Sequence, residues 1–241
     1  MTQTQSTLQG LLADAFSRGE PVDPATLPLP SVADAYAVQE DLFRRGGYPL
    51  TGFKLSLREG VAYSAPLLFL DSCGESAFKP GTIVEPELAL TLGADLPPRE
   101  KPYSRDDVHG AIAKVSLGVE IARSRLLPGA AWPLGLADFL SNVGYLVGET
   151  LDPSLLAAEA DLGAVRVTSD GHVLVEAAAR HPDGDPLAAL VAYANGAPGP
   201  LGSLKAGQVI TTGSLCGAVR VPSPSTVAIS LAGARYELRL S

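Results

Sequence analysis

Two glutamates in the stretch VEPELALTLG, residues 84–93, have a spacing that could support chemistry. The stretch alternates like a strand with one buried face, and Glu85 and Glu87 fall on the other face, about 7 Å apart along the backbone. At an effective dielectric constant of roughly 20, two charges at that spacing repel each other by about 2 kcal/mol. The pair would either face solvent or need a neutralising partner, and the pair alone leaves both interpretations open.

A third carboxylate favours the second interpretation. Glu120 lies in VSLGVEIA, a strand of the same design, where Ser116 and Gly118 share its face and leave room beside it. If the two strands are neighbours, three carboxylates converge, and burying even one isolated ionised carboxylate is prohibitive. A divalent ion with oxygen ligands, Mg²⁺ or Mn²⁺, would relieve that cost.

Lys54 in the strand TGFKLSL is the candidate proton carrier. It shares the small-residue face of an otherwise apolar strand. Three glutamates, a divalent ion and one ammonium have a formal charge of zero, and we expect the ion and a desolvated pocket to lower the pKa of Lys54 toward neutrality. The alternative is a lysine at a strand edge whose charged end reaches solvent.

The composition bounds the class of protein. The chain has 241 residues, 46% of them hydrophobic, which is enough for one core or a core with a small appendage. A net charge of −8 without a basic run makes nucleic acid an improbable partner. No apolar run reaches the roughly 18 residues of a membrane span, and the N-terminus does not resemble a secretory signal. Cys73 and Cys216 are expected to be free thiols that pack as small apolar side chains in a protein of the reducing cytoplasm.

The elements that would position these residues are mostly strands. Two helices are predicted over residues 6–19 and 31–46, the second opened by a Ser31–Asp34 capping box, and they define a small helical unit at 1–50. Residues 51–241 form the second predicted domain. Strands are predicted at 51–57, 84–93, 115–122, 207–214, 226–233 and 234–241, and a hairpin at 165–177 that turns at Asp170-Gly171. Further helices are predicted at 106–114, 136–148 and 185–194. Residues 58–82 show no regular pattern. Because strict βαβ alternation is missing, the fold class is α+β, a mixed β-roll or sandwich with few helices.

Several short motifs then add a family resemblance. GFKLSL, VEPELAL, LGVEIARSR, ADFLSNVGYLVG and GQVITTGSLCGAV occur in an order that resembles the 2-keto-4-pentenoate hydratase/4-oxalocrotonate decarboxylase family of the fumarylacetoacetate hydrolase superfamily. AYAVQ and GDPLAALVAYAN resemble it too, so the similarity runs from about residue 25 to the end. The resemblance implies a fumarylacetoacetate hydrolase-like mixed β-sandwich roll with a small N-terminal domain.

The resemblance also implies roles for individual residues. Glu85, Glu87 and Glu120 match the family's metal ligands, and Lys54 matches its catalytic lysine. The following assignments are less specific: Ser214 would lie beside the substrate carboxylate or simply form a turn, and Asp138 would have a catalytic, supporting or capping role. The stretch REGVAYSAPLLFLDS departs from the family because it is shorter and lacks an expected aspartate, for which Ser64 or Asp71 are the available substitutes.

The leading functional expectation is a lyase: a metal-dependent hydratase of 2-hydroxy-2,4-dienoates, acting in aromatic-compound degradation. The first alternative is a decarboxylase of 2-oxo-3-enedioates, which needs a cation for the distal carboxylate, with Arg58 and Arg123 as candidates. Acylpyruvate hydrolysis ranks lower because no histidine precedes His109. A weakly active partner subunit is the non-enzymatic alternative. Association into a homo-oligomer is expected by analogy with the family.

Overall fold

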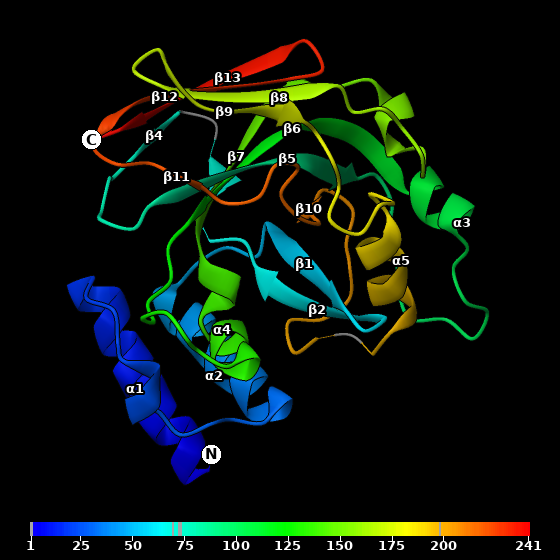
Figure 1. The fold of residues 1–241 in the computed structure, drawn as a ribbon. Coiled ribbons are helices and arrows are strands. Elements are labelled where there is room, and N and C mark those ends of the chain that lie inside the picture. The colour runs from blue at the N-terminus through cyan, green and yellow to red at the C-terminus, as the bar shows by residue number, and fades with distance from the viewer. Residues whose placement is uncertain (1, 69, 72–73, 198) are drawn as a thin grey trace.

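The computed structural model describes residues 2–68, 70–71, 74–197 and 199–241 and has a mixed α+β architecture (Figure 1). Two sheets stack on each other in the upper part of the molecule as drawn. A layer of helices lies below them. No helix of the described chain is long and apolar enough to span a membrane.

The larger sheet carries Lys54 and the three predicted glutamates, whereas Asp138 and Ser214 lie outside its strands. It has eight strands in the order β2-β1-β10-β5-β6-β7-β3, with β11 paired to β5 beside this path. The bounds are β1 (Gly52–Arg58), β2 (Val61–Pro66), β3 (Leu70–Asp71), β5 (Ile83–Leu92), β6 (Ile112–Ala122), β7 (Asn142–Thr150), β10 (Val209–Thr211) and β11 (Val219–Arg220). The β1–β10 pair is parallel, so the first strand of the sheet lies beside one from much later in the chain.

The smaller sheet closes the core from the other side. Its five strands run in the order β4-β13-β12-β8-β9, with bounds β4 (Glu75–Ser76), β8 (Ala164–Ser169), β9 (His172–Ala178), β12 (Ser225–Leu231) and β13 (Ala234–Leu240). One large hydrophobic cluster takes side chains from both sheets and from α3 (Arg105–Gly110) and α5 (Ala188–Asn195). This burial is the main source of stability.

A second hydrophobic cluster belongs to the helical layer. It joins α1 (Gln3–Arg18), α2 (Val32–Gly46) and α4 (Trp132–Ala137). The predicted capping box is confirmed, because Asp34 N–H donates to Ser31 Oγ at 3.1 Å and Ser31 N–H donates to Asp34 Oδ2 at 3.2 Å. Short 3₁₀ turns occur at Pro24–Thr26, Phe139–Ser141 and Pro153–Leu156.

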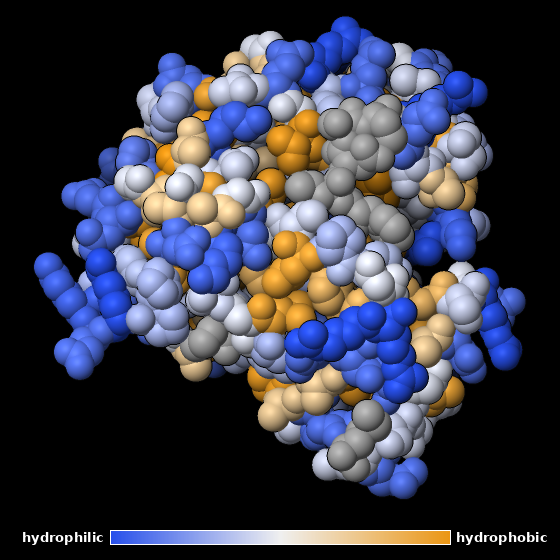
Figure 2. Space-filling view, turned by 180° about the vertical axis from the view of Figure 1, so that it is seen from behind, coloured by the Kyte–Doolittle hydropathy of each residue, from blue (hydrophilic) through white to orange (hydrophobic). Residues whose placement is uncertain are grey.

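The outer surface between these layers is mixed in character. Figure 2, which views the molecule from behind, shows a small hydrophobic patch near the middle of that face, surrounded by hydrophilic side chains. A cavity of about 380 Å³ lies where the helical layer meets the strands. Phe16 and Tyr48 line it on the helical side, and Ile121 and Leu146 on the strand side.

Three predicted elements were wrong. The helix predicted at 136–148 is instead the end of α4 followed by β7, because Phe139, Leu140 and Ser141 adopt left-handed backbone angles that end any helix. Ser104, not Asp106, caps α3, and the helix ends at Gly110 because β6 begins at Ile112. The stretch 58–82 contains β2, which forms a hairpin with β1 through a turn at Glu59-Gly60.

Candidate active site

The β5–β6 register brings the three glutamates together. Glu85 lies directly opposite Glu120, and Glu87 lies opposite Gly118. Each of the three side chains places one carboxylate oxygen within 4.8 Å of the others. Glu87 and Glu120 are fully buried, whereas the side chain of Glu85 is 18% exposed and forms the open edge of the group. The sequence predicted this convergence, and its cause is the direct pairing of the two strands.

The proline between the two glutamates fits a gap in the sheet. β10 pairs with β5 at Leu90 and Thr91, and β11 pairs with it at Ile83 and Val84, so a loop covers the stretch between. The Pro86 carbonyl points toward that loop and accepts the Leu215 N–H at 2.8 Å. A residue without an N–H is tolerated there because no neighbouring strand needs the donor.

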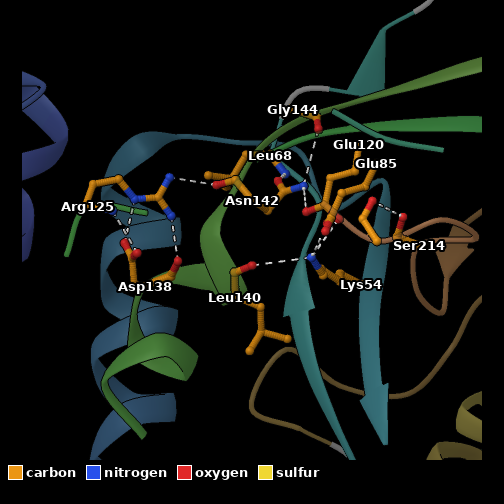
Figure 3. A network of polar contacts seen from close by, with 11 residues as sticks. Lys54, Leu68, Glu85, Glu120, Arg125, Asp138, Leu140, Asn142, Gly144 and Ser214 are labelled. Atoms are coloured by element: carbon orange, nitrogen blue, oxygen red, sulfur yellow. Dashed lines mark hydrogen bonds and ion pairs between the residues drawn. The ribbon is translucent and has the colours of Figure 1, made fainter. Parts of the chain in front are cut away.

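Lys54 reaches the glutamates from β1. Its Nζ donates to Glu120 Oε2 at 2.7 Å, and lies 3.4 Å from both Glu85 Oε2 and the Leu140 carbonyl oxygen (Figure 3). Burial acts to lower the pKa of Lys54, but Glu120, Glu85 and Glu87 outweigh it and raise that pKa above its ordinary value. In the protein chain without a cation, the three carboxylates thus keep the pKa of Lys54 above its ordinary value. The lowering expected when a divalent ion is bound stays a prediction.

The carboxylates are perturbed by the same burial. It raises the pKa of Glu120 to about 7, against the favourable effect of Lys54. Burial, followed by the charge of Glu120, raises the pKa of Glu87 well above its ordinary value. Both oxygens of Glu87 are buried without a hydrogen-bond partner in the described chain. The protein thus holds three acids and one base with a net formal charge of −2 when all are ionised.

This donor set fits a divalent cation. Three carboxylates supply the hard oxygen ligands that Mg²⁺ and Mn²⁺ prefer, and a charge of +2 balances the group. The two orphaned oxygens of Glu87 are the strongest evidence, because a buried carboxylate without any partner is unfavourable. Glu85, Glu87 and Glu120 are the residues that would hold the ion.

Asn142 orients Glu120 from the adjacent strand. Its amide Nδ2 donates to Glu120 Oε1 at 3.0 Å, and its Oδ1 accepts the Leu68 N–H at 2.8 Å. Asn142 is fully buried at the start of β7. One oxygen of Glu120 is thereby fixed, and the other faces Lys54. Sequence reasoning missed this contact because residues 136–148 were predicted to be helical.

Asp138 lies in a neighbouring buried ion pair with Arg125. Arg125 Nε donates to Asp138 Oδ1 at 2.5 Å, and Arg125 Nη1 donates to the Asn142 carbonyl at 2.8 Å. Figure 3 shows the pair on the far side of Asn142 and Leu140 from Lys54. Burial raises the pKa of Asp138, against the influence of Arg125. The ring of Phe16 in α1 lies 4.2 Å from the Arg125 guanidinium, so the helical layer covers this pair.

The ion pair borders a strained backbone segment. Phe139, Leu140 and Ser141 all have positive φ angles, between 51° and 67°, and each such residue costs free energy unless its surroundings enforce the conformation. The segment lies between Asp138 and Asn142, which are both held by Arg125. This backbone conformation directs the Leu140 carbonyl oxygen toward the Nζ of Lys54.

Ser214 lies on a loop next to Glu85 and Lys54 in Figure 3. Its Oγ donates to the Gly217 carbonyl at 2.8 Å, so it also makes the turn that the sequence left as an alternative. Gly213 has φ +134°, and a Cβ there would lie 2.6 Å from the Pro182 ring. His181 holds the same loop by pairing its Nε2 with Thr212 Oγ1 at 2.8 Å, and burial lowers the pKa of His181 to about 4.

The structure places the other candidates away from the glutamates. The Arg58 guanidinium stacks 4.2 Å from the Trp132 ring. Arg123 lines a cavity together with Ile121, which belongs to the core on the face opposite Glu120. The hydroxyl of Ser64 lies 3.4 Å from the Tyr193 hydroxyl, on the Leu55 side of the sheet. The side chain of Asp71 and the whole of Cys73 lie outside the described residues.

Comparison with known proteins supports the fold. No family model and no curated protein sequence matches the chain. Among solved structures, 4-oxalocrotonate decarboxylase from Pseudomonas putida G7, complexed with magnesium and adipate, matches with a TM-score of 0.74 and 21% identity, covering 100% of this chain and 99% of that one.

More distant solved structures share the same fold. A putative fumarylacetoacetate hydrolase family protein from Yersinia pestis CO92 matches at TM-score 0.56 and 17% identity, over 80% of this chain and 94% of that one. Maleylpyruvate hydrolase from Sphingobium sp. SYK-6, in complex with manganese(II) and pyruvate, matches at TM-score 0.52 and 12% identity, over 86% and 85%. The chain therefore has the fumarylacetoacetate hydrolase-like fold, and the fold predicted from the sequence motifs is confirmed.

Proposed function

We propose that this chain is a divalent-metal-dependent lyase of the fumarylacetoacetate hydrolase superfamily that acts on 2-oxo acids and their enol forms. The observation that carries the proposal is the group formed by Lys54 with three glutamates, two of them fully buried. The solved structures with this fold include enzymes determined with magnesium or manganese and a carboxylate compound. Mg²⁺ or Mn²⁺ is the cofactor we assign to Glu85, Glu87 and Glu120.

The roles of the residues follow from their positions. When bound, the cation supplies Lewis-acid polarisation of the substrate's 2-oxygen. Lys54, held beside Glu85 and the Leu140 carbonyl, can hold or deliver a proton where negative charge develops on the substrate. The Ser214 hydroxyl, which donates to the Gly217 carbonyl in this structure, would bind the substrate carboxylate by exchanging that hydrogen bond. Asp138 serves as a support for the Leu140 segment through its pair with Arg125.

Within this class we propose hydration of a 2-hydroxy-2,4-dienoate. The reaction ketonises the dienol to a 2-oxo-3-enoate and adds water across the conjugated double bond, which needs one substrate carboxylate to be bound. Lys54 is the cation that contacts the glutamates in the described chain, and it is ion-paired. Arg58 and Arg123, the candidates for a second carboxylate, lie elsewhere. A substrate with a single carboxylate fits this arrangement better than a dicarboxylate.

Decarboxylation of a 2-oxo-3-enedioate is the second candidate. The full-length structural match to 4-oxalocrotonate decarboxylase favours it. The same enolate would form by loss of CO₂ instead of proton transfer, so Lys54 and the glutamates would keep their positions. The two reactions differ in what must hold the far end of the substrate.

Two substrates separate the candidates. Purified protein with Mg²⁺ should bleach the absorbance of 2-hydroxypenta-2,4-dienoate and yield 4-hydroxy-2-oxopentanoate. Release of CO₂ from 2-oxo-3-hexenedioate without turnover of the dienoate would replace the hydratase by the decarboxylase. If the protein binds Mg²⁺ but turns over neither substrate, it is a weakly active partner subunit, and co-purification with an active lyase would then be the next measurement.

A further inference from the structure

A group of buried oxygen atoms behind the glutamates is poorly supplied with hydrogen-bond partners in the described chain. It comprises both carboxylate oxygens of Glu87 and the hydroxyls of Ser116, Tyr145 and Thr211. Within the group the Thr211 hydroxyl faces that of Tyr145, and this contact acts to lower the pKa of Tyr145 against the stronger effect of burial. All four residues are 0% exposed. Buried polar atoms in folded proteins nearly always have a protein or water partner, so such a concentration requires an explanation.

The strand register places these oxygens on one face of the larger sheet. Ser116 lies opposite Ala89, two residues beyond the pair formed by Glu87 and Gly118. Thr211 lies beside Lys54 on β10. These positions alternate with the core-facing residues, so they share the face of the glutamates.

The phenol of Tyr145 reaches the same place from β7. Tyr145 lies opposite Glu120, but a Cβ built on Gly118 would meet its hydroxyl at 1.9 Å. The ring therefore crosses over Gly118 toward Glu87 and Ala89. Gly118 and Ala89 are the small residues beside the hydroxyl, while Leu67, Val209 and Val147 pack with Tyr145 and Ala89 in one apolar cluster.

A metal ion explains only part of this group. A cation on the glutamates would satisfy oxygens of Glu87, but it cannot accept the protons of three hydroxyls. A water molecule can both accept from hydroxyls and donate to a carboxylate, and buried waters typically make about three such hydrogen bonds. The hydroxyls and the carboxylate together offer enough partners for it.

We propose that Ser116, Tyr145 and Thr211 form an internal water site that hydrogen-bonds the Glu87 carboxylate from behind. Glu120 is oriented by Asn142 and Lys54, and Glu85 by Lys54, whereas Glu87 has no direct partner in the described chain. Carboxylates that bind metals are normally oriented by a second hydrogen bond. Ordered water supplies that bond for Glu87. The effect on metal affinity rests on the proposed function, but the water site itself does not.

A crystal structure of the metal-free protein near roughly 1.5 Å resolution tests the water directly, since buried waters are ordered. We expect density within hydrogen-bonding distance of Glu87 and of at least two of the three hydroxyls. Density for no water among these oxygens would overturn the proposal. A wild-type protein that shows the water but binds no Mg²⁺ would leave the site in place and remove the metal-binding function instead.

Two substitutions test the water in solution. Y145F and S116A each remove one hydroxyl from the shared water, so the change in Tm of the double variant should be smaller than the sum of the single changes. The double variant should also weaken Mg²⁺ binding about tenfold. Y63F, which alters a tyrosine in edge-to-face contact with Trp132 outside the group, should leave Tm and affinity unchanged. If Tm rises additively with each lost hydroxyl, the hydroxyls are dry and the water site does not exist.

Discussion

Replacing Glu87 by glutamine should stabilise the metal-free protein while abolishing its response to Mg²⁺. Glu87 is fully buried and has no hydrogen-bond partner in the described chain, and it shares its pocket with two further carboxylates. The amide has the same shape as the carboxyl group but no charge. The substitution therefore separates the electrostatic cost of the site from its packing.

The magnitude follows from the geometry. Carboxylate oxygens of the three glutamates lie within 4.8 Å of one another, and two unit charges at such a distance repel by about 3.5 kcal/mol at an effective dielectric constant near 20. Ionised Glu87 meets two such charges, and Lys54 offsets roughly one of them, so the charges alone make ionisation cost about 3.5 kcal/mol, and burial adds a desolvation cost to this. Keeping Glu87 protonated at pH 8 instead would cost about 5 kcal/mol relative to the unfolded chain. The lower of these costs is what E87Q removes.

Thermal unfolding at two pH values measures this difference. At pH 8 with EDTA, E87Q should raise Tm by roughly 7–14 °C, whereas at pH 5 the gain should be small because protonation then costs less than about 1 kcal/mol. Excess Mg²⁺ at about a hundred times its Kd should stabilise the wild type by about 2.7 kcal/mol and leave E87Q unchanged. E176Q, at an exposed ion pair on β9, is the matched control. A lower Tm for metal-free E87Q at pH 8, or a full Mg²⁺ response, would refute the reasoning.

Three further predictions concern the surrounding residues. K54M should lower turnover by about 10²–10⁴-fold without weakening Mg²⁺ binding in calorimetry, because the role proposed for Lys54 is proton transfer and not metal binding; equal losses in both would make it a structural residue. The raised pKa of Glu120, about 7 against an ordinary 4.5, means that the folded protein binds this proton more tightly than the unfolded chain does. The stabilising contribution of this proton is thus complete below pH 4.5 and is lost as the pH rises through 7. The Tm of the metal-free protein should therefore fall from pH 5 to 8, while the affinity for Mg²⁺ rises. An E120Q variant with the same pH profile of Tm would assign the effect to another group. R125M leaves buried Asp138 without its cation and should cost about 3–5 kcal/mol in urea unfolding, compared with less than about 1 kcal/mol for R166M at an exposed pair; similar losses would contradict the supporting role.

The sequence predicted the parts of the site that follow from alternation along a strand. Glu85 and Glu87 had to share a face, and Lys54 had to share one with small residues, because side chains alternate in any strand. The pairing of Glu85 with Glu120 was only a hypothesis at that level, since register depends on contacts between distant segments. The order of the family-like motifs supported the pairing of these two strands, and the observed fold has that pairing.

The contacts around Asn142 were beyond prediction for a physical reason. The run from Leu136 to Gly148 is apolar and short, and short apolar runs fit a helix and a buried strand equally well. What decides the outcome is the left-handed backbone from Phe139 to Ser141, which is enforced by its surroundings and not by its own residue types. The Arg125–Asp138 pair that borders it joins residues 13 positions apart without a motif.

The parallel pairing of β1 with β10 has a consequence for synthesis of the chain. Lys54 leaves the ribosome early, but the strand that flanks it, ending at Thr211, is made much later. The β5–β6 hairpin must therefore emerge with its acids already facing each other while the sheet beside them is still incomplete. Non-local pairing of this kind is slow to form. The three glutamates are therefore synthesised before the strand that joins β5 to β1, and the part of the sheet that brings Lys54 next to them is completed only when β10 is made.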